Sequence, residues 1–298
     1  YVHGVRILFL PRFVPIRLVV RRIFRPTMTF QKILFSAILV ALPINEGAAQ
    51  PMSPQPNAGR ADFADLALNA TTVARAQIVD AKEVKRERAP GLAPGFRRFL
   101  VRAQVQSVLA APAGVPGEIT YLVDIPENER GRTPRMEGQI VLLFLGAEHA
   151  PGEFVLAHKY GQQAWSAGRE QIVSRFLGER AAAGGAPRAE SISSAFHVPG
   201  SIPGESETQI FVRTQNGRPL SLVVLRRPGV DPHVVLSTGD IIDPNAPAPD
   251  AGSLSSVILA CSLPAQLPQD ISGGSNGEAL AADYQVALQA LGTCDRNF

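Results

Sequence analysis

The sequence is poor in the residue types on which most recognisable catalytic and metal sites depend. It has 2 Cys, 5 His and 1 Trp among 298 residues, and aromatic residues make up only 6% of the chain. No two histidines stand three or four residues apart and there is no HExxH motif, so the usual zinc-site pattern is absent. Gly273–Gly277 is rich in glycine but lacks the lysine of a phosphate-binding loop, and we expect it to be a flexible entry to the final helix.

Long apolar runs are also lacking, and a run of ten uncharged residues near the start of the chain indicates where the protein is sent. Residues 33–42 (ILFSAILVAL) are uncharged, follow Lys32 and precede the small residues Gly47 and Ala49. This order is typical of a secretory signal peptide, and a membrane-spanning helix would need about 20 apolar residues. We therefore expect cleavage between Ala49 and Gln50 and a periplasmic or secreted location; the alternative is an uncleaved anchor.

The segment before this run fits a native start poorly. Met28 is the first methionine, and residues 1–27 hold six arginines and no acidic residue. We expect residues 1–27 to be a non-native upstream translation and residues 28–49 to be the signal peptide. The alternative for residues 1–27 is a cationic amphipathic membrane segment.

Basic residues are scarce once the predicted signal is removed. The full chain has a net charge of +3, but residues 1–49 hold seven of its 29 Lys and Arg and one of its 26 Asp and Glu. The remaining chain therefore has a net charge of −3. A chain of this charge gives no indication of nucleic-acid binding.

The two cysteines, Cys261 and Cys294, are predicted to form a disulfide. In an exported chain this is the simplest state for two cysteines, and the bond would close a loop of about 33 residues. Two free thiols or a reactive pair are the alternatives. The absence of a CxxC spacing disfavours redox chemistry.

The first half of the mature chain is predicted to form a small barrel. After a polar linker over residues 50–60, a short helix is expected over residues 62–68, with two acids in its first turn that suit the helix dipole. Five strand-like segments follow, at residues 72–84, 96–109, 118–125, 139–145 and 153–159. Residues 96–109 alternate between apolar and polar side chains, and the continuous apolar run at 139–145 predicts a strand buried on both faces.

This order of strands carries a resemblance. The segments TTVARAQIVDAK, RRFLVRAQVQSVL, GEITYLVDI, EGQIVLLFLG and GEFVLA resemble a module of exported bacterial proteins of unknown function, which is similar to five-stranded OB-type barrels. The resemblance covers about residues 62–160 and implies an OB-like barrel over 61–165. OB-type barrels often bind oligonucleotides or sugars. The stacking aromatics and basic groove of single-strand binders are missing here, and we interpret Arg97, Arg98 and Arg102 as a solvated strand face.

The second half is predicted to be a separate, β-rich domain. Residues 166–189 are expected to form a connecting helix, 166–183, and a linker, with Trp165 packed against the helix. The domain over 190–298 would hold strands at 208–214, 220–227, 233–238 and 255–261, with Asn216-Gly217 as a hairpin turn. The stretches 198–203, 244–249 and 264–268 are proline-rich and are expected to be loops. A closing helix over 278–291, stopped by Gly292, would be joined by the disulfide to the last strand.

The predicted fold class is therefore mainly β with a few helices: a small OB-like antiparallel β-barrel, a connecting helix and a disulfide-bonded β-sandwich-like domain. The end of the sequence, LACSLPAQLP and DYQVALQALGTCDRNF, also resembles uncharacterised exported bacterial proteins. That resemblance implies no activity.

The predicted function is that of an exported, non-enzymatic binding or accessory protein of the bacterial cell envelope. We expect no catalytic residue, cofactor or metal, and a partner that is an envelope protein or a small ligand of unknown identity. Nucleic acid is not expected, a membrane is expected only if the signal is uncleaved, and the oligomeric state is left open. One alternative is a hydrolase of unfamiliar type, with a deep pocket that gathers some of His158, His197, Glu205 and Asp240. The other is a membrane-anchored interaction protein that keeps its signal.

Overall fold

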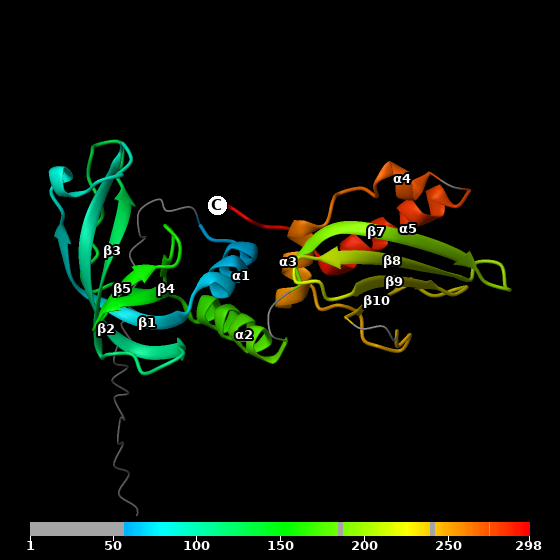
Figure 1. Ribbon diagram of the computed structural model, residues 1–298, viewed down its shortest axis with the longest axis horizontal. Helices are drawn as coiled ribbons and strands as arrows, with labels where there is room; N and C mark the ends of the chain where they lie inside the picture. Colours follow the sequence, from blue (N-terminus) through cyan, green and yellow to red (C-terminus); the bar gives the residue numbers. More distant parts are fainter. Residues whose placement is uncertain (1–56, 184–186, 239–241, 274) are drawn as a thin grey trace, which may run out of the picture. The chain divides into compact units, whose positions relative to one another are not determined.

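The computed structural model describes residues 57–183, 187–238, 242–273 and 275–298. The predicted signal peptide, its cleavage position at Ala49 and Gln50, residues 1–27 and Asp240 lie outside the described residues. Within the described residues the protein is mainly β, with two separate sheets and five α-helices (Figure 1).

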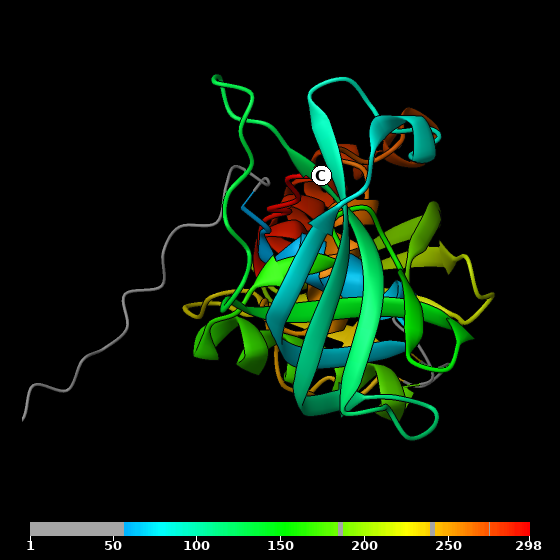
Figure 2. The same cartoon turned by 90° about the vertical axis from the view of Figure 1, so that its left-hand side faces the viewer.

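The first sheet is a closed, OB-like barrel. Its strands are β1 (Thr72–Glu83), β2 (Phe96–Ala110), β3 (Glu118–Pro126), β4 (Ile140–Ala150), β5 (Glu153–Leu156) and β6 (Gln162–Ala164), in the spatial order β1-β2-β3-β5-β4-β6. The barrel closes because β1 pairs with β4 as well as with β2 (Figure 2). All pairs are antiparallel except β3 with β5. The five predicted strands are thus confirmed, and only the three-residue β6 was not foreseen.

The barrel is filled by alternate side chains, as its sequence pattern indicates. Phe99, Val101 and Ala103 of β2 point into its core, while every residue from Val141 to Leu145 on β4 is buried. The inner side chains of β4 belong to the barrel core, and its outer ones, Leu142 and Phe144, pack against helices. The prediction that this run is buried on both faces is therefore confirmed.

Two helices supply the apolar layer outside β4. They are α1 (Arg60–Asn69) and the predicted connecting helix, α2 (Ala167–Ala183), which starts after Ser166. The Ser166 hydroxyl oxygen accepts a hydrogen bond from the Arg169 amide at 3.3 Å. Trp165 packs on this apolar cluster, as predicted, and its indole N–H donates to Glu170 on α2.

The second sheet has four antiparallel strands with helices on one face. The strands are β7 (Ala189–Pro199), β8 (Ser206–Thr214), β9 (Leu220–Arg226) and β10 (His233–Ser237), in the order β10-β9-β8-β7. Three helices follow, α3 (Leu254–Ser262), α4 (Gln269–Ser272) and α5 (Gly277–Leu291). Side chains of α3 and α5 form the core against one face of this sheet (Figure 1), so the layer opposite the sheet is helical.

Two local predictions are wrong in this half. The segment 255–261, predicted as a strand, is helix α3, because its apolar run fits a buried helix equally well and the Ser253 side chain caps it by accepting from the Ser256 amide at 3.1 Å. The expected loop at 198–203 begins later, since β7 continues to Pro199. Two irregularities in its pairing with β8, between Ala189 and Ser194, break the alternation that would have revealed this edge strand.

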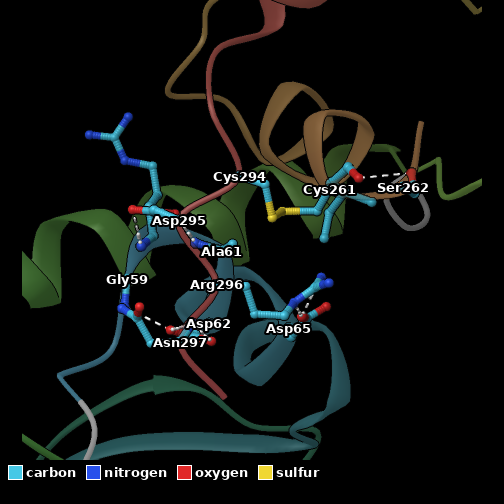
Figure 3. Close-up of a disulfide and its surroundings, with 12 residues drawn as sticks. Gly59, Ala61, Asp62, Asp65, Cys261, Ser262, Cys294, Asp295, Arg296 and Asn297 are labelled. Carbon is cyan, nitrogen blue, oxygen red and sulfur yellow. Dashed lines mark hydrogen bonds and ion pairs between the residues drawn. A yellow bond between two sulfur atoms is a disulfide. The ribbon is translucent and has the colours of Figure 1, made fainter. Parts of the chain in front are cut away.

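The predicted disulfide and final helix are both present. Cys261 and Cys294 are bonded, 33 residues apart, and α5 ends before Gly292, whose φ of 93° favours glycine. The bond joins the segment after α5 to helix α3 rather than to a strand (Figure 3). Along the described ranges, no helix is both long and apolar enough to cross a membrane.

Residues Asp295–Phe298, which we call the C-terminal clamp, follow the disulfide and lie on helix α1. The Asp295 carboxylate accepts hydrogen bonds from the amides of Arg60 and Ala61, both at 2.8 Å, at the start of α1 (Figure 3). These amides have no partner inside the helix, and a carboxylate there also suits the helix dipole. The clamp therefore completes the beginning of α1 from a position more than 230 residues away in sequence.

Acidic side chains of α1 hold the rest of the clamp. The buried Asp62 carboxylate accepts from the amides of Asn297 and Phe298, at 2.9 and 3.2 Å, while Asp65 pairs with Arg296 at 2.8 Å. The Phe298 ring stacks on His158 with a centroid distance of 5.5 Å. The two acids expected to complement the helix dipole thus bind the clamp.

The C-terminal clamp packs closely against Gly59, which precedes helix α1. A Cβ at this position would lie 1.8 Å from the Asp295 carbonyl oxygen, so Gly59→Ala cannot be accommodated without moving the clamp. We expect the variant to lose about 1–3 kcal/mol of stability and to expose residues 295–298, measured by urea unfolding and by hydrogen exchange. Gly178→Ala is the control, because a Cβ at that position of α2 meets nothing within 4 Å. Unchanged exchange at residues 295–298 in Gly59→Ala would contradict the close fit.

Candidate functional site

The structure places the residues of the predicted hydrolase site in different surroundings. His158 follows β5 and contacts Tyr160 and Phe298, where burial and the nearby Lys159 lower its pKa. His197 lies on β7 and faces the helices, whereas Glu205 lies between β7 and β8. Within the described residues, no hydrogen bond or ion pair joins these three residues, and Asp240 lies outside that part of the chain.

His197 belongs to a polar cluster on the face of the second sheet that packs against helix α5. Its Nδ1 lies 2.8 Å from the Thr208 hydroxyl of β8, and that hydroxyl donates to the Asp283 carboxylate of α5. The other carboxylate oxygen accepts from Nε of Arg226, on β9, at 2.6 Å. Because the Thr208 proton goes to Asp283, the Nδ1 atom of His197 must be the donor to the hydroxyl oxygen.

The Thr208 hydroxyl and the Asp283 carboxylate of this cluster are closed to substrates. Thr208 is 0% exposed and Asp283 is 1% exposed, so the hydroxyl cannot reach a molecule from solution. Each carboxylate oxygen is satisfied, as burial of a charge requires. The cluster therefore joins helix α5 to strands β7, β8 and β9 and acts in folding.

The opposite face of the same sheet carries a pocket of about 600 Å³. Thr208, Ile210 and Val212 of β8 face the helices, so the alternate residues Glu207, Gln209 and Phe211 face away from them. The pocket lies where β7, β8 and β9 end near the β7–β8 connection, and Pro244 lines its side.

Strand register builds the floor of this pocket. Val198 of β7 pairs with Glu207 of β8, which in turn pairs with Leu225 of β9. One step along, Phe196 pairs with Gln209. Side chains at paired positions lie about 4.5–5.5 Å apart at Cβ, so a single carboxylate stands in the middle of an apolar row.

The apolar side chains of the pocket are unusually open to solvent. Phe196 is 59% exposed and Val198 is 61% exposed, and Ile202 in the adjacent connection is 58% exposed. Phe196 contacts Phe211 edge to face, with centroids 6.0 Å apart, which fixes one side of its ring. A concave group of exposed large apolar side chains is the usual mark of a binding surface.

Some charged side chains of the pocket have an ion-pair partner and others do not. Arg226 is paired with Asp283 on the helical side of the sheet, whereas Arg227 at the rim is exposed. Among the ion pairs of the described residues, none involves Glu205, Glu207 or Arg227. Glu207 accepts one hydrogen bond, from the Gln209 side chain at 2.6 Å.

A second hollow of about 400 Å³ continues from the pocket along β9 and β10. It shares Leu225, Arg227 and Pro244 with the first and adds Val230 and His233. The His233 ring nitrogen Nε2 lies 2.8 Å from the Ala246 carbonyl oxygen, which holds the segment that carries Pro244 against the sheet.

The outer face of the barrel is the other exposed surface of note. Leu100, Leu122 and Val155 are exposed on neighbouring strands, but the hollows beside them hold only about 220 and 190 Å³. The three arginines interpreted as a solvated strand face are each paired with an acid: Arg97 with Glu127, Arg98 with Asp124 and Arg102 with Glu118. Their charge is therefore balanced on the strand surface itself.

Gly273–Gly277 leads into α5, where the sequence places the entry to the final helix. The same stretch has Gly-x-Ser-x-Gly spacing around Ser275, a signal that the sequence predictions above overlooked. In hydrolases this spacing forms a turn from a strand into a helix. Here helix α4 precedes it, and the Asn276 side chain donates to the His197 carbonyl oxygen at 3.2 Å.

No metal-binding group of three or more His, Cys, Asp or Glu is found in the part of the chain that the structure describes. No family model matches the sequence, and no curated protein matches it.

Proposed function

We propose that this protein is an exported, non-enzymatic binding protein whose ligand site is the pocket formed by β7, β8 and β9. The observation that carries the proposal is the exposure of Phe196 and Val198, 59% and 61%, inside a hollow of about 600 Å³. Single-ligand pockets typically have volumes of about 300–1,000 Å³ and combine apolar walls with a few polar groups. The pocket on this sheet has that composition.

Two features support export. Residues 33–42 have the pattern of a signal peptide, and Cys261 and Cys294 form a disulfide, a bond that persists mainly in oxidising compartments. The proposed location of the protein is therefore the bacterial cell envelope.

Export is tested by sequencing the N-terminus of the protein recovered from the periplasm. We expect the mature chain to start at Gln50, because Gly47 and Ala49 are the small residues that signal peptidase requires. Recovery in the membrane fraction with residues 33–42 retained would support the anchored alternative instead. The same preparation supplies protein for the binding experiments.

Binding is tested by replacing the exposed apolar side chains. Phe196→Ser with Val198→Ser should abolish binding of a neutral apolar probe, n-hexanol, followed by amide chemical shifts, and should leave the fold unchanged because both side chains are exposed. Leu100→Ser with Leu122→Ser, on the barrel, is the matched control. Hexanol shifts that persist in the β7 variant, or that map to the barrel, would contradict the proposed site.

A hydrolase is the second candidate, favoured by one local arrangement. Asn276, next to Ser275, is bonded to the backbone of His197, whose Nδ1 lies 3.5 Å from the Asp283 carboxylate. A serine hydrolase needs a serine within reach of a histidine that an acid orients, and here Ser275 is the sequence neighbour of a residue bonded to the His197 backbone. Labelling of Ser275 by a fluorophosphonate, lost in Ser275→Ala and His197→Asn, would favour this candidate over a binding protein.

A further inference from the structure

We propose that the pocket selects small ligands that carry a primary ammonium group on an apolar chain. The inference rests on the proposed binding function and adds the chemistry of the ligand. It starts from Glu207, whose carboxylate lies in the apolar row between Val198 and Leu225.

Glu207 has unused capacity to accept hydrogen bonds. A carboxylate offers about four acceptor positions, and within the described ranges the Glu207 carboxylate receives one hydrogen bond, from the Gln209 side chain. Its side chain is half-buried among apolar neighbours, where an unpaired charge is less well solvated than at the surface. A ligand with a positive donor would supply the missing partner.

The other charges of the pocket make a cation the complementary ligand. Glu205 lines the same hollow and adds a second carboxylate, and Asp231 stands in the adjoining one. Arg226 is neutralised by Asp283, so Arg227 at the exposed rim is the one arginine or lysine of the two hollows without an ion pair among the described residues, and the only other basic side chain is the His233 imidazole. Three acids therefore face one unpaired arginine, and an anionic ligand would be repelled from the floor.

Phe196 supplies the second element of ammonium recognition. Its ring stands beside the Glu207 row and is 59% exposed, with one side fixed by Phe211. Aromatic rings attract ammonium groups through their electron-rich faces. Val198, Leu225 and Pro244 then offer an apolar wall for the carbon chain.

The size of the pocket favours a free small molecule over a protein segment. A volume of about 600 Å³ suits a single small ligand. The ammonium group that the pocket binds is therefore that of a free alkylamine rather than the lysine side chain of a peptide.

The test compares three six-carbon probes that differ only in charge: n-hexylammonium, n-hexanol and n-hexanoate. They are titrated into the protein purified from the periplasm, with calorimetry for affinity and amide chemical shifts for location. We expect hexylammonium to bind at least tenfold more tightly than the other two, with shifts at residues of the pocket. A blocked Leu-Lys-Leu peptide is the fourth ligand.

Glu207→Gln removes the charge and keeps the shape. We expect hexylammonium affinity to fall about tenfold, since bonds to a charged group are stronger than neutral ones, and hexanol affinity to stay the same, which also shows that the variant is folded. Phe196→Leu should lower the preference for hexylammonium about threefold. Glu190→Gln, an exposed acid on β7 outside the pocket, is the matched control.

Three results would overturn the inference. Equal affinity for hexylammonium and hexanol, or an unaffected preference in Glu207→Gln, would remove the ammonium assignment and leave the binding function intact. Tighter binding of the Leu-Lys-Leu peptide would reject the free amine as the ligand. No shift in the pocket with any of the four probes would reject the proposed function itself.

Discussion

Replacing Cys261 and Cys294 together by serine should lower the free energy of unfolding by about 3–4 kcal/mol. The disulfide closes a loop of 33 residues, and the chain-entropy model gives a stabilisation of this size for such a loop. The loss should be seen as a lower midpoint in urea, with a larger dependence on urea concentration because the unfolded chain is less constrained.

The disulfide prediction has an internal control. Dithiothreitol should lower the urea midpoint of the native protein to that of the double serine variant and should leave the variant unchanged. A native midpoint that does not move after the thiols are shown to be free would mean that the packing of α3 against α5 holds this region without the bond.

Asp283→Asn should destabilise the protein by about 2–3 kcal/mol. The change leaves the Arg226 guanidinium without its buried carboxylate and weakens the acceptor for Thr208. Asp283 is 1% exposed, so the change removes a buried, hydrogen-bonded charge, whereas Arg226, with 36% of its side chain exposed, is partly solvated and limits the loss. Urea unfolding followed by circular dichroism measures the effect.

A surface carboxylate gives the matched control for this experiment. Glu118 pairs with Arg102 at 3.2 Å with both side chains about half exposed, so Glu118→Gln should change stability by less than about 1 kcal/mol. A similar small effect for Asp283→Asn would show that the cluster beneath the sheet is solvated in solution. Restoration of stability by Asp283→Asn combined with Arg226→Leu would support the unpaired charge as the cause.

The barrel could be predicted from sequence because its signals are local. Alternation at residues 96–109 and the unbroken apolar run at 139–145 each describe the surroundings of one strand, and the strands follow one another along the chain. Helix α3 could not be predicted, since a short apolar run such as Val257–Leu259 does not distinguish a strand from a buried helix.

The candidate pocket depends on information that no single segment contains. Val198, Glu207 and Leu225 become neighbours only through the pairing of three strands, and the pairing irregularities near the start of β7 decide which of its residues face the pocket. Glu205 could be singled out as a possible acid, but its position beside the exposed Phe196 could not. The Gly-x-Ser-x-Gly spacing of Gly273, Ser275 and Gly277, by contrast, is visible in the sequence itself.

The C-terminal clamp determines when helix α1 can be completed during synthesis of the chain. The amides at the start of α1 receive their partner from Asp295, so a growing chain must reach residue 295 before this helix can be finished. Contacts over such a separation are slow to form, because a long loop must close first. The start of α1 therefore stays without these partners until the chain has been synthesised as far as Asp295.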